Sequence, residues 1–276
     1  MLSKRFPEKR AFITGAASGL GLAFSKRLAK EGWRLMIADI NLERLGEAEI
    51  SLQAMGGTII SQVLDVADEQ EILVAAARIE REWGGVDMVF NNAGIAGSGP
   101  FEELGLEQWH RMLDIDLWSV IYGCRAFVPM MKRHGGGYLI NTASSAGTLA
   151  APQMANYNVA KAGVVSISET LKVELAPFNI GVTVVCPTVF KTNLGESLKG
   201  GTSFDHNLQR QLDVSTFTCE NVVDATFKVI NKNRTYVMPQ KDAIWMWRFK
   251  RLAPEFYLRL VSYLYSRRKW AFSYLE

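Results

Sequence analysis

Short apolar runs alternate with longer amphipathic stretches along most of the chain. We expect strands at 11–14, 34–38, 58–64, 88–90, 138–142, 182–185 and 235–237, and helices at 19–31, 42–55, 69–83, 106–132, 157–175 and 221–231. The strands are almost entirely apolar, as in a parallel sheet that helices cover on both faces. The stretch 106–132 is long enough to contain a break, and the glycine-rich, polar stretch 193–217 suits a mobile loop over a site. The alternation predicts one doubly wound α/β domain, built from right-handed βαβ units and reaching to about residue 240.

A glycine-rich turn follows the first expected strand and opens the first expected helix. It reads Thr14-Gly-Ala-Ala-Ser-Gly-Leu-Gly21. Glycine lets the backbone approach a pyrophosphate closely, and a helix N-terminus offers free N–H groups with a partial positive charge. The spacing differs from the usual Gly-x-Gly-x-x-Gly, and an ordinary strand-to-helix turn is the alternative. We predict a dinucleotide site that includes Gly15, Ser18, Gly19, Leu20 and Gly21.

Asp39 ends the second expected strand, 18 residues after Gly21. An acid at this place can accept hydrogen bonds from the hydroxyls of the adenosine ribose, and its charge repels a 2′-phosphate. Ile40 and Asn41 supply no compensating cation, and Arg44 is the nearest argument for the phosphorylated cofactor. The pattern favours NAD(H) over NADP(H). The alternative for Asp39 is that it caps the next helix.

A tyrosine and a lysine stand at positions i and i+4 of the helix expected at 157–175, so Tyr157 and Lys161 share one helix face. An ammonium group beside a tyrosine favours the phenolate, which can exchange a proton with a substrate oxygen. Lys161 can also reach the nicotinamide ribose. Ser144 stands thirteen residues before the tyrosine, where its hydroxyl can hold the same oxygen. Alone, such a pair often faces solvent; with the glycine turn and the serine it predicts hydride transfer at a carbonyl or alcohol carbon.

As a set, these motifs resemble the short-chain dehydrogenase/reductase family. The matching pieces are Thr14–Gly21, Asp39, Asp65-Val66, Asn91-Asn92-Ala93-Gly94, Ser144, Tyr157 with Lys161, and Pro187–Thr192. The resemblance runs from Thr14 to Thr192 and implies a fold that continues to about Pro239. It implies a Rossmann-type domain that binds NAD, and an oxidoreductase activity.

The resemblance also implies roles for residues that the motifs alone do not explain. Asp65 and Val66 would flank the adenine, and the segment 91–94, with Asn92 and Gly94, would stabilise the sheet and line the cofactor. Phe190 and Thr192 would hold the nicotinamide, Thr192 through the carboxamide. Family members commonly pair their subunits through the two helices that are here 106–132 and 157–175, which implies a homodimer or homotetramer.

Two positions depart from the family's pattern. The family's catalytic asparagine, which normally holds a water that connects the lysine to solvent, falls on Asp116. An aspartate can still hold that water, but its charge near Lys161 would favour the protonated lysine. We therefore predict that Asp116 shifts the pH optimum; a replacement tolerated with little effect is an equal alternative. The second departure is Thr188, in place of the usual glycine after Pro187, which adds a side chain beside the nicotinamide pocket.

After Pro239 the chain departs from the family's usual ending, and residues 241–276 predict an aromatic, basic, helical extension. Nine aromatic residues lie between Trp245 and Phe272, and residues 244–276 hold seven Lys or Arg against two Glu. One broad apolar helix face would consist of Phe256, Tyr257, Leu260, Val261, Leu264 and Tyr265, opposite Glu255, Arg259, Ser262 and Ser266. Such a helix can pack on the body, on a partner subunit or against the substrate, or it can lie on a membrane surface. Each outcome favours a bulky apolar substrate, such as a long-chain alcohol, a sterol or another lipid.

The composition excludes some classes of protein. The formal net charge of +3 is too small to argue for nucleic-acid binding. Three cysteines without Cys-x-x-Cys spacing predict no metal site, and they favour buried thiols in a reducing cytoplasm over a disulfide. No window reaches the roughly 20 apolar residues of a membrane span, and glycines interrupt any signal-like run near the N-terminus. We therefore expect a cytoplasmic protein.

These observations predict an NAD-dependent alcohol dehydrogenase or ketone reductase. Tyr157 would be the general acid and base, Lys161 would lower its pKa, Ser144 would position the substrate oxygen, and Asp116 would stand at the relay position. The rival from another class is a nicotinamide-binding sensor or scaffold without turnover, which Asp116 leaves open. A third reading, a peripheral membrane protein whose enzyme fold is incidental, rests on the tail alone. A fold of this kind hosts many reactions, so the substrate does not follow from it.

Overall fold

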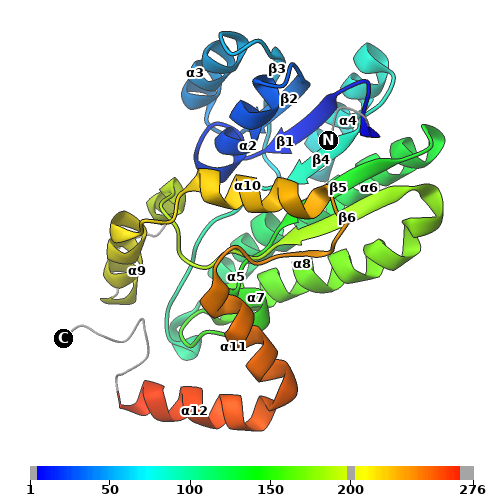
Figure 1. Ribbon diagram of the computed structural model, residues 1–276. Coiled ribbons are helices and arrows are strands. Elements are labelled where there is room, and N and C mark those ends of the chain that lie inside the picture. The colour runs from blue at the N-terminus through cyan, green and yellow to red at the C-terminus, as the bar shows by residue number, and fades with distance from the viewer. Residues whose placement is uncertain (1–4, 198–202, 268–276) are drawn as a thin grey trace.

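The computed structural model describes residues 5–197 and 203–267, and its centre is a seven-stranded parallel sheet. The strand order is β3-β2-β1-β4-β5-β6-β7 (Figure 1). The strands are β1 (Arg10–Thr14), β2 (Arg34–Asp39), β3 (Thr58–Val63), β4 (Met88–Asn91), β5 (Gly137–Thr142), β6 (Ile180–Val185) and β7 (Tyr236–Val237). The order reverses between β1 and β4, and doubly wound sheets bind their ligands at such a switch point. This topology confirms the predicted Rossmann-type fold.

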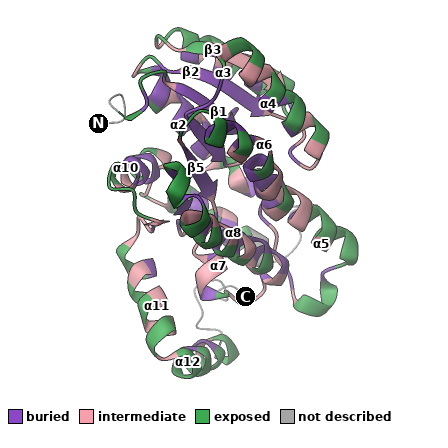
Figure 2. Ribbon diagram, turned by 90° about the vertical axis from the view of Figure 1, so that its right-hand side faces the viewer, coloured by how far each residue is buried: buried purple, intermediate pink, exposed green. Residues whose placement is uncertain are grey.

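Helices cover both faces of the sheet. One layer holds α2 (Gly19–Ala29), α3 (Leu42–Gln53) and α10 (Cys219–Ile230), and the other holds α4 (Glu69–Trp83), α6 (Ser119–Arg133) and α8 (Ala155–Glu174). Successive side chains of a strand point to opposite faces. Accordingly Ala11 and Ile13 of β1 pack under the first layer, whereas Phe12 packs under the second. Figure 2 shows the buried sheet between helices whose outer faces are exposed.

The long stretch expected to be helical at 106–132 is two helices joined by a wider turn. α5 (Leu106–Leu113) and α6 are separated by η2 (Asp114–Trp118), which has π-helical hydrogen bonding. Such single-turn π segments are frequent at functional sites. The predicted break is therefore real, and it contains Asp116, which is completely buried.

The prediction of a loop at 193–217 is wrong for most of the described part. This segment contains the short η4 (Asn193–Ser197) and the helix α9 (Ser203–Val214). Leu208 and Leu212, which are four residues apart and so share one helix face, are both buried. Their burial against the body fixes α9 as a helix; Gly200 and Gly201 lie outside the described residues.

The C-terminal extension is two helices rather than one. α11 (Lys241–Leu252) and α12 (Pro254–Ser266) meet at Ala253, and Pro254 starts the second helix (Figure 1). The broad apolar face expected on the second helix is divided: Tyr257 and Val261 are buried, whereas 62% of Phe256 is exposed. Trp270 and Phe272 lie outside the described residues. Within the described ranges, no helix is both long enough and apolar enough to cross a membrane.

Candidate active site

The glycine turn between β1 and α2 permits close approach to its backbone. Gly15 and Gly19 have φ angles of 63° and 51°, which favour glycine. A Cβ at Gly21 would overlap the carbonyl oxygen of Gly15. Ser18 makes no side-chain cap hydrogen bond to α2, and the first turn of that helix has no acidic residue. The N–H groups at the start of α2 are therefore left for an anion, so the turn fits a pyrophosphate.

Asp39 is fixed beside this turn at the end of β2. Its Oδ2 accepts a hydrogen bond from the N–H of Ala17 at 3.0 Å, and its Oδ1 accepts one from Asn41 at 3.0 Å. The side chain that caps α3 is Asn41, which accepts from the N–H of Arg44 at 3.0 Å. The alternative of Asp39 as a helix cap is therefore wrong. Its carboxylate lies where it can accept hydrogen bonds from the hydroxyls of a ribose.

The charge of Arg44 is engaged elsewhere. Its Nη1 donates to Oε2 of Glu196 at 2.6 Å, across 152 residues of sequence. Glu196 also accepts from the side-chain amide of Asn193 at 2.6 Å, so two residues of η4 take part. An exposed pair of this kind contributes little to stability. Its consequence is that Arg44, the first cation after Asp39 in the sequence, already has an anionic partner.

Asp65 and Val66 follow β3, next to the end of β2. Val63 pairs with Asp39 in the sheet register, so the two segments lie side by side. Oδ1 of Asp65 accepts from the N–H of Ala67 at 2.9 Å, and Val66 is buried. The structure thus brings Asp65 and Val66 to the same edge as Asp39, and their contact with the adenine stays a prediction.

Side chains at the ends of β1, β4 and β5 tie the strands together at the switch point. Asn92 donates to the carbonyl oxygen of Thr14 at 3.1 Å, and its Oδ1 accepts from the hydroxyl of Thr142 at 3.2 Å. The buried Asn91 donates to Asn141 at 2.9 Å. These contacts agree with the stabilising role that the resemblance implied for the segment 91–94.

Phe190 and Thr192 lie in the segment that follows β6, and this segment passes next to the glycine turn. A Cβ at Gly19 would stand 2.8 Å from Oγ1 of Thr192, so this hydroxyl lies directly over the turn. Phe190 is buried in the same apolar cluster as Ala17 and Leu20. Both residues are therefore close to the predicted phosphate site, and their contact with a nicotinamide stays a prediction.

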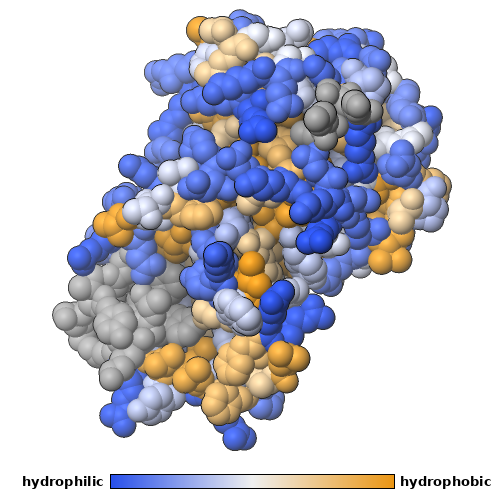
Figure 3. All heavy atoms as spheres, in the orientation of Figure 1, coloured by the Kyte–Doolittle hydropathy of each residue, from blue (hydrophilic) through white to orange (hydrophobic). Residues whose placement is uncertain are grey.

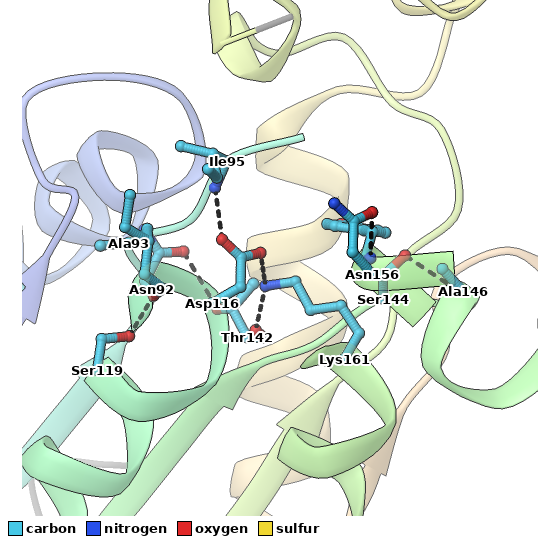
Figure 4. A network of polar contacts seen from close by, with 12 residues as sticks. Asn92, Ala93, Ile95, Asp116, Ser119, Thr142, Ser144, Ala146, Asn156 and Lys161 are labelled. Atoms are coloured by element: carbon cyan, nitrogen blue, oxygen red, sulfur yellow. Dashed lines mark hydrogen bonds and ion pairs between the residues drawn. The ribbon is translucent and has the colours of Figure 1, made fainter. Parts of the chain in front are cut away.

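Asp116 and Lys161 form a buried ion pair at the centre of the site (Figure 4). Nζ of Lys161 lies 2.8 Å from Oδ2 of Asp116, and the two side chains are 4% and 0% exposed. Oδ1 of Asp116 accepts from the N–H of Ile95 at 2.8 Å, and Lys161 donates to the carbonyl oxygen of Thr142 at 3.2 Å. A Cβ at Gly94 would come within 3.3 Å of both charged groups. Aspartate at this position therefore brings a negative charge into direct contact with the lysine.

Tyr157 lies one helical turn before Lys161, whose ammonium is 5.6 Å from the centre of the tyrosine ring. Burial opposes the charge of Lys161, but Asp116 and Tyr157 offset it and raise the pKa of Lys161. Burial raises the pKa of Tyr157; Lys161 lowers it, Asp116 raises it again, and a hydrogen bond with Ser144 lowers it. Lys161 thus acts in the predicted direction, while burial keeps the net pKa of Tyr157 above its ordinary value.

Ser144 stands between β5 and the short helix α7 (Ala146–Leu149). Its Oγ accepts from the N–H of Ala146 at 3.2 Å and donates to the carbonyl oxygen of Pro187 at 3.4 Å. These two contacts hold the hydroxyl in place. Neither is an ionic interaction, so the hydroxyl can turn toward a substrate oxygen.

Apolar side chains surround Tyr157. The cluster that contains it consists of Ala96, Met112, Ala146, Met154, Ala160, Leu208 and Leu212, with Ile95, Leu113, Leu117, Ala151, Val189 and Leu194 packed against it. Sequence reasoning did not identify two of the contributing elements, α7 and α9. The spacing of Leu208 and Leu212 was the available signal for α9.

Comparisons with known proteins match this architecture. A family model described as short chain dehydrogenase matches residues 9–202. Cyclohexanol dehydrogenase of Acinetobacter sp. (strain SE19) is 34% identical over 195 residues, which cover 70% of this chain and 78% of the relative. D-threitol dehydrogenase of Mycolicibacterium smegmatis is 36% identical over 197 residues, or 71% of this chain and 76% of that protein.

The chain is also similar to a solved structure and to part of a longer relative. The short chain dehydrogenase/reductase of Burkholderia phymatum in complex with NAD superimposes with a TM-score of 0.85 and is 28% identical, covering 90% of this chain and 96% of that one. The probable oxidoreductase EphD of Mycobacterium tuberculosis is 34% identical over 190 residues, which cover 68% of this chain and 32% of EphD. The chain therefore matches about a third of the length of that relative.

Proposed function

This chain belongs to the short-chain dehydrogenase family, and on that premise we propose that it oxidises a secondary alcohol, or reduces the matching ketone, with NAD(H). The observation that carries the proposal is the convergence of Ser144, Tyr157 and Lys161 beside the glycine turn at the sheet's switch point. The proton-transfer groups and the phosphate-binding backbone come from separate parts of the sequence, which makes a chance arrangement improbable.

Each residue has a defined task in the proposed reaction. In alcohol oxidation the Tyr157 phenolate accepts the hydroxyl proton as the substrate C–H bond breaks; in reduction the Tyr157 hydroxyl donates that proton to the carbonyl oxygen. Ser144 holds this oxygen by a hydrogen bond, and Lys161 stabilises the phenolate by its charge. Bound NAD(H) would accept or supply the hydride. Asp116 holds Lys161 in its charged form.

The carboxylate of Asp39 supports the preference for NAD(H). It is fixed beside the glycine turn, where it can accept hydrogen bonds from ribose hydroxyls and would repel a 2′-phosphate. The ion pair with Glu196 engages Arg44, the first cation after Asp39 in the sequence. Both observations favour the cofactor without the extra phosphate.

The surroundings of Tyr157 support a bulky apolar substrate. The side chains of its cluster are aliphatic or thioether groups, which bury apolar surface favourably. The two characterised relatives differ in the polarity of the alcohol that their names state, so the names alone do not set the substrate class. We therefore base this part of the proposal on the cluster and on the aromatic C-terminal helices.

Homo-oligomer formation is part of the same proposal. Four large apolar side chains are exposed on the two helical segments through which the family commonly pairs its subunits: Leu106, Trp118, Val159 and Val173. A second copy of the chain would cover them. The expectation of a cytoplasmic location stays an expectation.

The test is a steady-state assay that follows the absorbance of reduced nicotinamide. The purified chain is given NAD⁺ or NADP⁺ with secondary alcohols graded from short to long-chain and steroidal. We expect turnover with NAD⁺, a rise in kcat/KM with apolar size, and loss of activity in Tyr157→Phe. Full activity of Tyr157→Phe would contradict the catalytic assignment, and a preference for small polar alcohols would contradict the substrate class.

A second candidate function is an NAD(H)-binding sensor or scaffold with little catalysis. The buried pair between Asp116 and Lys161 favours it, because the negative charge opposes the lowering of the tyrosine pKa. Fluorescence titration with NADH separates the two candidates. Tight binding of NADH without turnover on any alcohol or ketone, at any pH at which the chain stays folded, would support the sensor.

A further inference from the structure

The two C-terminal helices present large apolar side chains to solvent. The exposed fractions are 67% for Trp245, 87% for Leu252, 62% for Phe256 and 57% for Tyr263. We call these four residues, with Leu260 and the exposed cations Arg248, Arg251, Arg259 and Arg267, the tail surface. Figure 3 shows hydrophobic side chains gathered over α12 at one end of the molecule. A contiguous patch of this kind usually marks an interaction site.

The opposite faces of these helices are held firmly on the body. Tyr257 donates to the carbonyl oxygen of Leu149 at 3.0 Å, and Lys250 donates to that of Thr148 at 2.8 Å. Tyr257, Val261 and Leu149 form a buried cluster. The inner faces of α11 and α12 therefore pack against α7 and hydrogen-bond to it. The exposed apolar side chains of the tail surface lie on the faces that the body does not cover.

The charge of the tail surface is strongly positive. Residues 241–267 hold six Lys or Arg and two acidic residues. In the described part of the chain, the four arginines of the tail surface form no ion pair with an acidic side chain. Three of them lie against aromatic rings instead. Arg248 is 5.5 Å from the ring centre of Trp245, Arg251 is 5.0 Å from that of Trp247, and Arg267 is 5.6 Å from that of Tyr263. Aromatic rings interleaved with unpaired cations are suited to an anionic, partly apolar partner.

We propose that the tail surface docks on the surface of an anionic lipid bilayer. Tryptophan and tyrosine rings lie favourably at the level of the lipid headgroups. Amphipathic helices that lie in this plane insert their apolar side chains and keep their basic ones at the anionic headgroups. Each basic residue near such a surface contributes about 1 kcal/mol of attraction. The proposal does not depend on the reaction that the site catalyses.

A second copy of the chain is a poorer partner for the same surface. In a two-fold symmetric contact, each patch meets an identical patch. The unpaired arginines of one tail surface would then face those of the other, with only Asp242 and Glu255 to offset them. A bilayer supplies both the negative charge and the apolar layer that the tail surface lacks.

The experiment is sedimentation of the full chain with sucrose-loaded vesicles. One set is phosphatidylcholine alone, and the other contains phosphatidylglycerol as well. We expect binding to the anionic vesicles, weaker binding to the neutral ones, and loss of binding as salt is added. Trp245→Ser/Leu252→Ser should weaken anionic-vesicle binding at least about tenfold, because it removes two apolar anchors. Arg248→Glu/Arg251→Glu should weaken it as much and reduce its salt dependence, because only Arg259 and Arg267 of the tail-surface cations remain.

Matched controls lie elsewhere on the surface. Ile50→Ser changes an apolar residue of α3 that is 71% exposed, and Arg81→Glu reverses an arginine of α4 whose side chain is 71% exposed. Both should bind vesicles as the parent chain does. The proposal is overturned if the parent chain does not sediment with anionic vesicles, or if the controls lose binding equally. It is also overturned if Trp245→Ser/Leu252→Ser keeps vesicle binding and instead reduces the oligomeric state in sedimentation velocity. Thermal unfolding of each variant verifies that it is folded.

Discussion

The carboxylate of Asp116 and the ammonium of Lys161 are 2.8 Å apart, and both side chains are buried. Removing one partner of a buried ion pair leaves an uncompensated charge in a medium of low polarity. The ammonium of Lys161 therefore interacts with two groups. The carboxylate of Asp116 keeps it protonated, and its charge in turn lowers the pKa of Tyr157. This arrangement has consequences for pH dependence and for stability.

Asp116→Asn should shift alcohol oxidation toward lower pH. Asp116 raises the pKa of Tyr157, so its neutral replacement should lower that pKa. Oxidation needs the phenolate, which is present above the pKa of Tyr157. The acid limb of the profile of kcat/KM against pH should therefore move to lower pH in the variant. An acid limb in the same place as in the parent enzyme would show that Asp116 has no electrostatic effect on Tyr157.

Lys161→Met should destabilise the fold at neutral pH by about 3–5 kcal/mol, because the charge of Asp116 is then buried without a partner. The double variant Asp116→Asn/Lys161→Met should recover most of the lost free energy of unfolding. Urea unfolding of the parent, the two single variants and the double variant measures the coupling between the two residues. Additive effects of the two substitutions would refute a strong interaction in the folded state.

The structure explains which of these features a sequence can predict. Apolar strand runs and the glycine turn are local patterns, and the predicted strands and fold are confirmed. The proximity of Asp116 to Lys161 follows from the resemblance, but their direct contact depends on the π-helical turn η2. The pair Arg44–Glu196 joins exposed side chains 152 residues apart, and no local pattern indicates it. Helix α9 is not predicted, because the glycines beside it favour a loop, although the spacing of Leu208 and Leu212 favours a helix.

Asp39→Ser should weaken the binding of NADH roughly tenfold or more, because hydrogen bonds to a charged group contribute about 1.5–3 kcal/mol each. The same change removes the repulsion of a 2′-phosphate and should improve NADPH binding. Adding Glu196→Gln frees Arg44 from its partner and should improve NADPH binding further. Fluorescence titration of the parent chain and the two variants with each cofactor gives six dissociation constants. Equal binding of NADH and NADPH by the parent protein would already contradict the proposed preference.

Gly21→Ala should abolish cofactor binding and reduce stability, because its Cβ would overlap the backbone of Gly15, which cannot move without distorting the turn. Overpacking of this kind costs about 1–3 kcal/mol or more. Gly46→Ala is the matched control, since Gly46 lies inside α3 and a Cβ there meets no atom within 4 Å. It should leave NADH binding unchanged and stabilise the chain by about 0.5–1 kcal/mol, because alanine favours the helix. Thermal unfolding and NADH titration of both variants provide the measurement. Normal NADH affinity in Gly21→Ala would show that the turn does not need the close approach on which the dinucleotide site rests.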